Sequence, residues 1–210
     1  DPTDLLSVDP ALGGERAMER LLKAAHSRGM RVVVDAATTH VNEANPTFWD
    51  LARKQQRSRY ADWYRVRRFP VIPGDSSTYG HYPGHPEQPW LDLRSPRARR
   101  YVFRGLEMLV ELGVDGLRLA TMHEAPPEFW AELRSKLRSK NPELLLLGQV
   151  VGDNVAHLAE QSGIDAVGDY RHREAMLAFF GRGAIDAEEF WTRTRFAELR
   201  TGPFDPSFRV

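Results

Sequence analysis

Hydrophobic and polar positions along the chain follow a repeating order of helix, glycine and buried strand. Residues 15–28 carry apolar side chains at helical spacing, and Gly29 stands where such a helix should end. Residues 30–35 contain three consecutive valines, which is typical of a buried strand. The same order recurs at 97–112 and 114–119, which predicts a parallel α/β fold.

The second half of the chain continues this order. Helix and strand patterns alternate there, and two further helical stretches follow them. The expected elements are a helix at 127–140, a strand at 144–150, a helix at 154–162, a short strand at 166–170, and helices at 172–180 and 187–199. We therefore expect about four parallel strands, joined by helices.

Residues 41–95 interrupt the order. The segment holds many prolines, and no long periodic stretch follows Arg59. It is too long for a structureless loop, so we expect it to pack on its own aromatic side chains. Those side chains are Phe48, Trp49, Tyr60, Trp63, Tyr64, Tyr79, Tyr82 and Trp90. The predicted organisation is thus 1–40, an inserted segment at 41–95, and 96–210.

Composition excludes several classes of protein. With 41% hydrophobic residues among 210, the chain can form a sizeable core. The absence of cysteine excludes disulfide scaffolds, thiolate zinc sites and cysteine nucleophiles. No apolar run approaches the roughly 20 residues that span a bilayer, so no membrane partner is expected. The chain opens on Asp1 rather than Met, which leaves its location open, with the cytoplasm favoured.

A basic cluster at 53–68 carries seven basic and one acidic side chain, interleaved with aromatics. This pattern also occurs in nucleic-acid surfaces. Basic and acidic residues balance at 29 each over the whole chain, which favours an ordinary solvated surface. We therefore expect no nucleic-acid partner.

Candidate chemistry lies where the predicted strands end, because functional groups of parallel α/β barrels follow the carboxyl ends of strands. The predicted strand ends carry the segments Asp35–His40, Gly116–Ala120 and Gly148–Val151. In these segments the sequence resembles the α-amylase superfamily, family 13 of the glycoside hydrolases, whose motifs are Asp-x-x-x-Asn-His, Gly-x-Arg-x-Asp and Gly-Glu-x-x in the same order. Further similar segments are 7–13, 25–32, 60–64 and 90–93. The order of motifs implies a partial (β/α)8 TIM-type barrel with a short inserted segment.

The departures from the family pattern concern catalysis. The resemblance implies a retaining mechanism with two carboxylates about 5–5.5 Å apart. The nucleophile position holds Ala120, whose methyl group forms no ester, and the acid/base position holds Gln149, whose amide exchanges no proton near neutral pH. No His-Asp pair of the fourth motif follows Tyr170. We expect a catalytically inactive homologue; the alternatives are a fragment or inactivated variant of an active α-glucan hydrolase or transglycosidase, and a non-catalytic interaction module.

The residues that remain are those that the resemblance associates with sugar binding. They are Asp35, His40, Arg118, His123 and Glu124. Taken without the family, each would be read as a strand-end or helix-start residue; Tyr170 is read as structural. The expected ligand is an α-glucan or maltooligosaccharide. The calcium-binding Asn of many members is Thr39, a poorer oxygen ligand, so no metal or cofactor is expected.

A half-barrel of four strands would leave sheet edges unpaired, which proteins normally avoid. A full barrel typically takes about 250 residues. We therefore expect a partner that completes the sheet, such as a second copy of the chain, or terminal segments that cover the edges.

Overall fold

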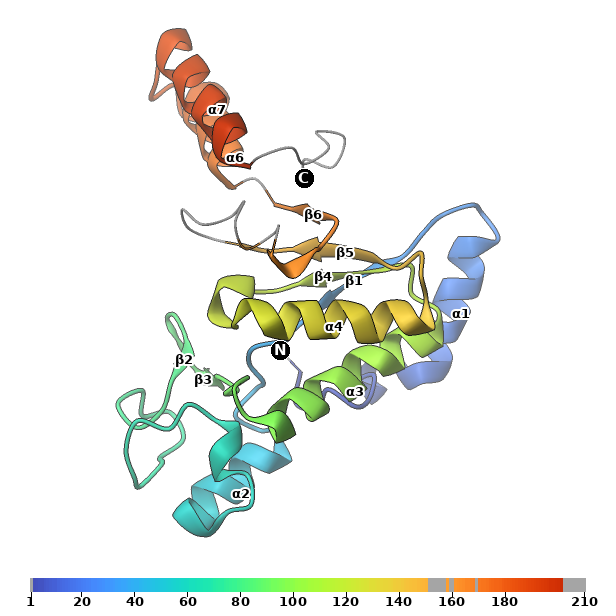
Figure 1. Ribbon diagram of the computed structural model, residues 1–210, viewed down its shortest axis with the longest axis vertical. Helices are drawn as coiled ribbons and strands as arrows, with labels where there is room; N and C mark the ends of the chain where they lie inside the picture. Colours follow the sequence, from blue (N-terminus) through green and yellow to red (C-terminus); the bar gives the residue numbers. More distant parts are fainter. Residues whose placement is uncertain (1, 151–157, 159–160, 169, 202–210) are drawn as a thin grey trace.

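The core of the protein is a four-stranded parallel sheet in the order β1-β4-β5-β6, seen in a computed structural model that describes residues 2–150, 158, 161–168 and 170–201 (Figure 1). The strands are β1 (Val33–Ala36), β4 (Gly116–Leu119), β5 (Leu145–Gly148) and β6 (Ala166–Val167). All neighbouring pairs are parallel. This confirms the partial (β/α)8 barrel that the strand pattern and the motifs predicted.

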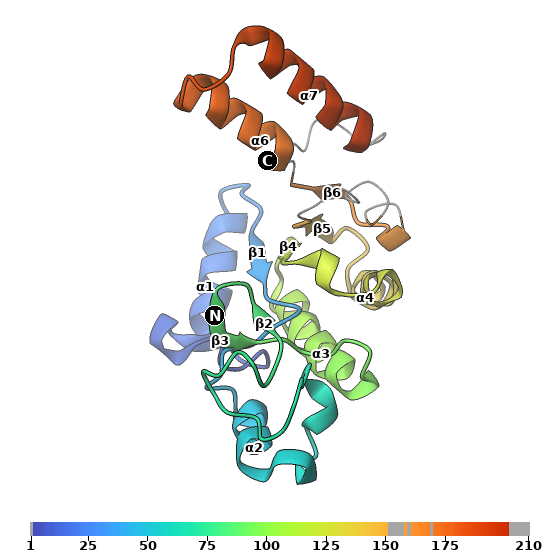
Figure 2. The ribbon, with the colours of Figure 1, turned by 90° about the vertical axis from the view of Figure 1, so that its left-hand side faces the viewer.

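Helices α3 (Pro96–Leu112) and α4 (Pro127–Lys140) lie side by side against one face of the sheet (Figures 1 and 2). The predicted bounds of α4 are correct, and α3 begins as expected, because the Ser95 hydroxyl accepts a hydrogen bond from the backbone N–H of Ala98. Helix α1 (Gly14–His26) precedes β1, and a short 3-10 turn η1 (Pro10–Leu12) precedes α1.

The two faces of the sheet differ in burial, and this difference positions the site. Leu117, Leu119 and Leu146 point toward the helices and are buried. Residues between them point to the opposite face, where Val33 remains 41% exposed and the Arg118 side chain is half-buried. The open face corresponds to the interior of a complete barrel.

The strands are shorter than the apolar runs predicted. Strand β1 begins at Val33 rather than residue 30, since Met30 is exposed and has no strand partner in the pairing with β4. Strand β6 ends at Val167, and Tyr170 belongs to a helix instead of the expected strand. Most of the helix predicted at 154–162 lies outside the described residues.

The inserted segment contains helix α2 (Pro46–Lys54), two 3-10 turns, η2 (Gln55–Arg57) and η3 (Ala61–Trp63), and an antiparallel pair, β2 (His81–Tyr82) with β3 (His85–Pro89).

Aromatic side chains form the centre of the inserted segment, as expected. The Phe48 ring lies edge-on against Tyr64 and Tyr79 at centroid distances of 5.1 and 5.0 Å, and all three side chains are buried. Trp49 does not join them and is exposed, because the helix turns it about 100° away from Phe48.

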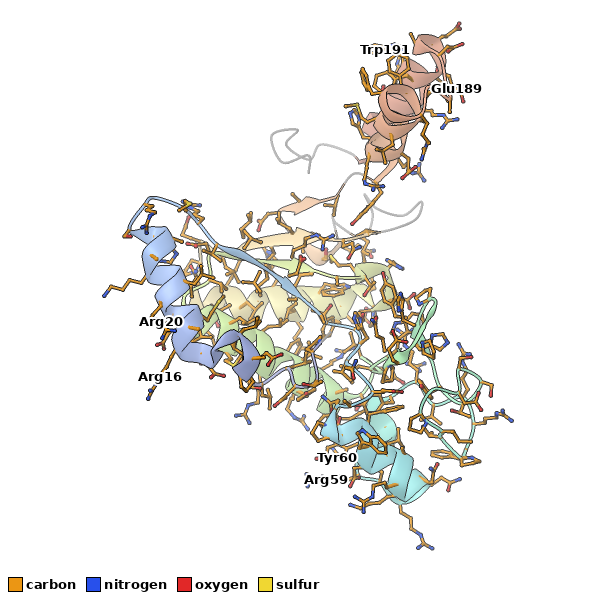
Figure 3. The ribbon with its side chains drawn as sticks, turned by 180° about the vertical axis from the view of Figure 1, so that it is seen from behind. Arg16, Arg20, Arg59, Tyr60, Glu189 and Trp191 are labelled. Carbon is orange, nitrogen blue, oxygen red and sulfur yellow. The ribbon has the colours of Figure 1, made fainter. Side chains whose placement is uncertain are left out.

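At the C-terminal end, α6 (Tyr170–Met176), the π-helical turn η5 (Leu177–Gly181) and α7 (Ala187–Thr201) form a hairpin that stands away from the sheet (Figures 1 and 2). Figure 3 shows Trp191 on this hairpin, and Arg59 with Tyr60 at the opposite end of the molecule. No helix among the described residues is long and apolar enough to cross a membrane.

Candidate functional site at the carboxyl ends of the strands

Asp35 and Arg118 occupy paired register positions on β1 and β4. The Arg118 Nη1 donates a hydrogen bond to Asp35 Oδ1 at 3.0 Å, and its Nη2 donates to the Tyr170 hydroxyl at 3.0 Å. Burial alone would lower the pKa of Arg118, but the hydrogen bond and charge of Asp35 raise it above its ordinary value. The guanidinium is therefore a permanent cation, oriented by two oxygen atoms on the open face of the sheet.

Ala120 and Gln149, the residues predicted to stand at the catalytic carboxylate positions of the family, lie at the same edge of the sheet. Ala120 N–H donates to the Ala36 carbonyl at 3.2 Å, and Gln149 N–H donates to the Leu119 carbonyl at 2.9 Å. Both residues follow immediately after strand ends. A methyl group and an amide therefore stand at this edge, and neither is a carboxylate.

His40 lies beneath this edge rather than on the open face. Only 4% of it is exposed, and its ring is 5.4 Å from the Tyr82 ring. Burial lowers the pKa of His40 to about 4, so the imidazole is neutral at physiological pH. As a neutral ring it can donate one hydrogen bond and accept another, and it supplies no charge.

The hydroxyls of Thr39 and Thr121 form a buried pair. The Oγ1 atoms of Thr39 and Thr121 are 2.5 Å apart, and both residues are buried. Thr121 adopts the left-handed conformation with φ 49°, which is uncommon for a β-branched residue. The Thr39 hydroxyl is thus already engaged with Thr121 and with the His40 Nδ1 at 3.4 Å. Among the described residues, no three His, Asp or Glu side chains gather as a metal site.

His123 and Glu124 belong to a 3-10 turn, η4 (Met122–Glu124), that faces the inserted segment. The Glu124 carboxylate accepts a hydrogen bond from Arg65 Nη1 at 2.8 Å, and His123 Nε2 lies 3.8 Å from the other carboxylate oxygen. Backbone hydrogen bonding from Met122 N–H to the Gln149 carbonyl holds the turn against the strand ends.

Reasoning from the sequence missed two residues that complete this arrangement. The sequence predicts a structural role for Tyr170, although this residue ends the last predicted strand, a position where functional groups gather. In the sequence, Arg65 is only one member of the basic cluster at 53–68. Its partner Glu124 is 59 residues away, and no local pattern indicates such a pair.

A partial parallel β/α barrel with polar side chains at the carboxyl ends of its strands places the protein among the TIM-type barrel proteins. The sequence model of the α-amylase catalytic domain matches residues 1–197, and the chain belongs to the α-amylase family.

Similar proteins include neopullulanase 2 of Thermoactinomyces vulgaris, with 33% identity over 90% of this chain and 32% of the relative. A cyclomaltodextrinase of a Bacillus species is 32% identical over 90% of this chain and 34% of its own length. The solved structure of the type III pullulan hydrolase of Thermococcus kodakarensis superimposes with a TM-score of 0.82 at 29% identity, over 94% of this chain and 35% of that one. The chain spans about a third of the length of the curated relatives it matches.

Proposed function

We propose that the chain is a non-catalytic member of the α-amylase family that binds an α-glucan at the carboxyl ends of its strands. One observation carries the proposal: Arg118 is held by Asp35 and Tyr170 at a strand end whose two chemical positions are Ala120 and Gln149. The binding groups persist, whereas the groups that would break a glycosidic bond do not.

The geometry suits a hydroxyl-rich ligand. Arg118 uses one N–H of each Nη for Asp35 and Tyr170. Its further N–H groups have no partner among the described residues and can donate to sugar hydroxyls. The Asp35 side chain is 75% exposed, which leaves carboxylate oxygens accessible as acceptors. The relatives named neopullulanase and cyclomaltodextrinase support an α-glucan as the ligand class. In this proposal His40 supports the site from below, and His123 and Glu124 form its wall toward the inserted segment.

The first experiment measures turnover and binding on the same preparation. We expect no hydrolysis of maltooligosaccharides or of a nitrophenyl α-glucoside above a buffer blank. We expect calorimetric titration with maltose and acarbose to give heat that Arg118→Ala removes. The control is Arg104→Ala, which replaces an exposed arginine on α3 and should bind as the parent does. Turnover that Arg118→Ala abolishes would overturn the proposal.

Two alternatives predict different outcomes. For a fragment or inactivated variant of an active enzyme, the double change Ala120→Asp and Gln149→Glu should restore hydrolysis. For an interaction module without a sugar site, no saccharide should give heat with any variant.

We also propose that a second copy of the chain covers the free edge of β1. The carbonyls of Val32 and Ala36 accept hydrogen bonds from the residues that flank β4, Asp115 and Ala120. Because backbone groups alternate in direction along a strand, the N–H and C=O groups of Val33 and Asp35 point away from β4. An unpaired edge of this kind favours strand addition. Sedimentation should detect a dimer, and a monodisperse monomer would contradict this assignment.

The division into 1–40, 41–95 and 96–210 likewise remains our proposed organisation of the chain.

A further inference from the structure

An apolar cavity of about 280 Å³ lies beside β1, where the N-terminal residues and α1 meet α3. Its lining includes the apolar side chains of Val8, Met18, Val34 and Leu106. The volume lies just below the range of roughly 300–1,000 Å³ that is usual for small-molecule sites. The cavity therefore suits one large apolar side chain better than an extended ligand.

The charge around this cavity is acidic. Among the described residues, the charged side chains that line it are Asp4 and Asp35. Asp35 already pairs with Arg118, whereas Asp4 accepts hydrogen bonds from uncharged donors, the Leu6 N–H at 3.0 Å and the Tyr101 hydroxyl at 3.1 Å. The Asp4 carboxylate has no basic partner in the described part of the chain. The rim of the cavity therefore favours a positive charge beside the side chain that enters it.

The C-terminal hairpin carries a side chain of this kind. Trp191 on α7 is 67% exposed, while its neighbour Phe190 stacks on Phe179 within the hairpin at 4.9 Å (Figure 3). Arg195 lies one helical turn after Trp191 on the same face of α7, and it is exposed with no carboxylate partner among the described residues. An apolar anchor with a positive charge beside it thus matches an apolar cavity with an acidic rim.

The order of the sheet keeps these two surfaces apart within one chain. The cavity lies beside β1 and the hairpin follows β6, and these are the two outer strands of the order β1-β4-β5-β6 (Figures 1 and 2). When β6 of one copy lies beside β1 of another, the hairpin of each copy comes next to the cavity of the other. A twofold arrangement of this kind uses the contact twice. It also joins four strands to four, which is the number in a closed parallel barrel.

We propose that the C-terminal hairpin is a docking arm for a second copy of the chain. Trp191 of each copy enters the cavity beside β1 of the other, and Arg195 approaches Asp4 there. The proposal rests on the second copy proposed above for the free edge of β1, and it names the surface by which that copy is held.

The exposed apolar surface of the hairpin is large enough for this role. An aromatic side chain buries about 150–250 Å² when it is enclosed. A stable interface buries roughly 800 Å² on each partner, and a twofold contact counts every side chain twice. The large apolar side chains exposed on the hairpin are Met176, Leu177, Phe180 and Trp191.

The first test is sedimentation velocity of the full chain over a range of concentrations, without saccharide. Trp191→Ala removes the anchor, and Leu12→Glu puts a negative charge at the cavity, where Leu12 is 75% exposed. Each should raise the dissociation constant of the dimer about tenfold or more, as the loss of a buried aromatic anchor does. Arg195→Glu should weaken the dimer more at low than at high salt, because it places two carboxylates together.

Two variants are matched controls. Trp49→Ala makes the same change at an exposed tryptophan of α2, and Leu21→Glu adds a charge at an exposed leucine of α1 that does not line the cavity. Both should sediment as the parent does. Circular dichroism should show the parental fold for every variant, since all the replaced side chains are exposed.

Disulfide trapping identifies the occupant of the cavity. The chain has no cysteine, so introduced cysteines report one contact each. Ser7→Cys lies at the cavity, and Thr192→Cys follows Trp191. A mixture of these two variants should form disulfides between chains faster than a mixture of Thr192→Cys with Ser76→Cys, an exposed position in the inserted segment. Equal rates would overturn the proposal. A disulfide within one chain of the double variant would show that the hairpin covers its own cavity, and would also overturn it.

The remaining outcomes separate the docking arm from the other proposals. A dimer that survives both Trp191→Ala and Leu12→Glu would overturn the arm and leave the covered edge of β1 standing. A monomeric parent would overturn both. The glucan site is judged by calorimetry with maltose, where Trp191→Ala should keep the heat that Arg118→Ala removes. Absence of that heat in a dimeric parent would overturn the glucan site alone.

Discussion

The guanidinium of Arg65 joins the inserted segment to the turn after β4 by pairing with Glu124, with Nη1 and Oε2 2.8 Å apart. Its other terminal nitrogen donates to the backbone carbonyl of the same residue. The side chains are 29% and 22% exposed, so water and salt screen this pair less than an ordinary surface pair. The contact fixes η4 relative to the inserted segment, and with it the wall of the proposed glucan site.

We expect Arg65→Met and Glu124→Gln each to lower the free energy of unfolding by about 1–3 kcal/mol, because each substitution leaves the other charged side chain half-buried without its opposite charge. A double-mutant cycle, measured by urea denaturation, should give a coupling of about 1 kcal/mol or more. The comparison pair is Arg193 with Glu189 on α7, which is about half exposed and should couple by only ~0.3–0.5 kcal/mol. Equal couplings for the two pairs would contradict the role assigned to Arg65.

His40 should make the stability of the protein depend on pH. Burial holds the pKa of this histidine at about 4 in the folded state, against 6.5 for an ordinary histidine. Above pH 6.5 both states are neutral, and the full stability is present. As the pH falls from 6.5 toward 4, His40 binds a proton in the unfolded chain but stays neutral in the folded chain. The free energy of unfolding therefore falls by up to about 3 kcal/mol.

Urea denaturation at pH 7.5 and pH 4.5 measures this loss. The variant His40→Gln should lose less stability between the two values than the parent does. His85→Gln replaces an exposed histidine of the inserted segment and should keep the pH dependence of the parent. If His40→Gln showed the same pH dependence of stability as the parent, another titratable group would be responsible for the loss at low pH.

The sequence predicted the order of elements because that order depends on local patterns. Helix α4 follows from its apolar spacing and Pro127, and α3 from Ser95 as its cap. Strand bounds depend on which neighbour is available for pairing. Strand β6 has only two residues paired with β5, so its ends could not be read from an apolar run.

The site was predictable only where a motif carried it. Asp35 and Arg118 stand in motifs, and their pairing follows from adjacent parallel strands. The contacts of Arg118 with Tyr170 and of Thr39 with Thr121 span 52 and 82 residues. Such contacts depend on how whole elements pack together, and no spacing within one segment encodes them.

Gly148 should be intolerant of a side chain, because it lies where β5 ends against η4 and the residues at the start of β6. A Cβ atom there would overlap Ile164 and stand 2.5 Å from the Met122 sulfur. We expect Gly148→Ala to cost about 1–3 kcal/mol of unfolding free energy, as overpacking of a core does. Gly181→Ala makes the same chemical change where the nearest neighbour is 3.9 Å away, and it should cost less than 1 kcal/mol. Similar midpoints in urea for both variants would contradict this packing.

Arg118 should matter for ligand affinity and hardly at all for stability. Its pair with Asp35 is exposed, with 38% and 75% of the two side chains accessible, and such pairs contribute about 0–1 kcal/mol. Arg118→Ala should therefore shift the thermal midpoint by only a few degrees while lowering affinity for acarbose at least tenfold. Arg118→Lys should rescue little of that affinity, because a single ammonium group cannot reproduce the planar fork that contacts both Asp35 and Tyr170. A large fall in the midpoint together with unchanged affinity in the surviving folded protein would show that Arg118 serves the fold and would refute its role as a ligand contact.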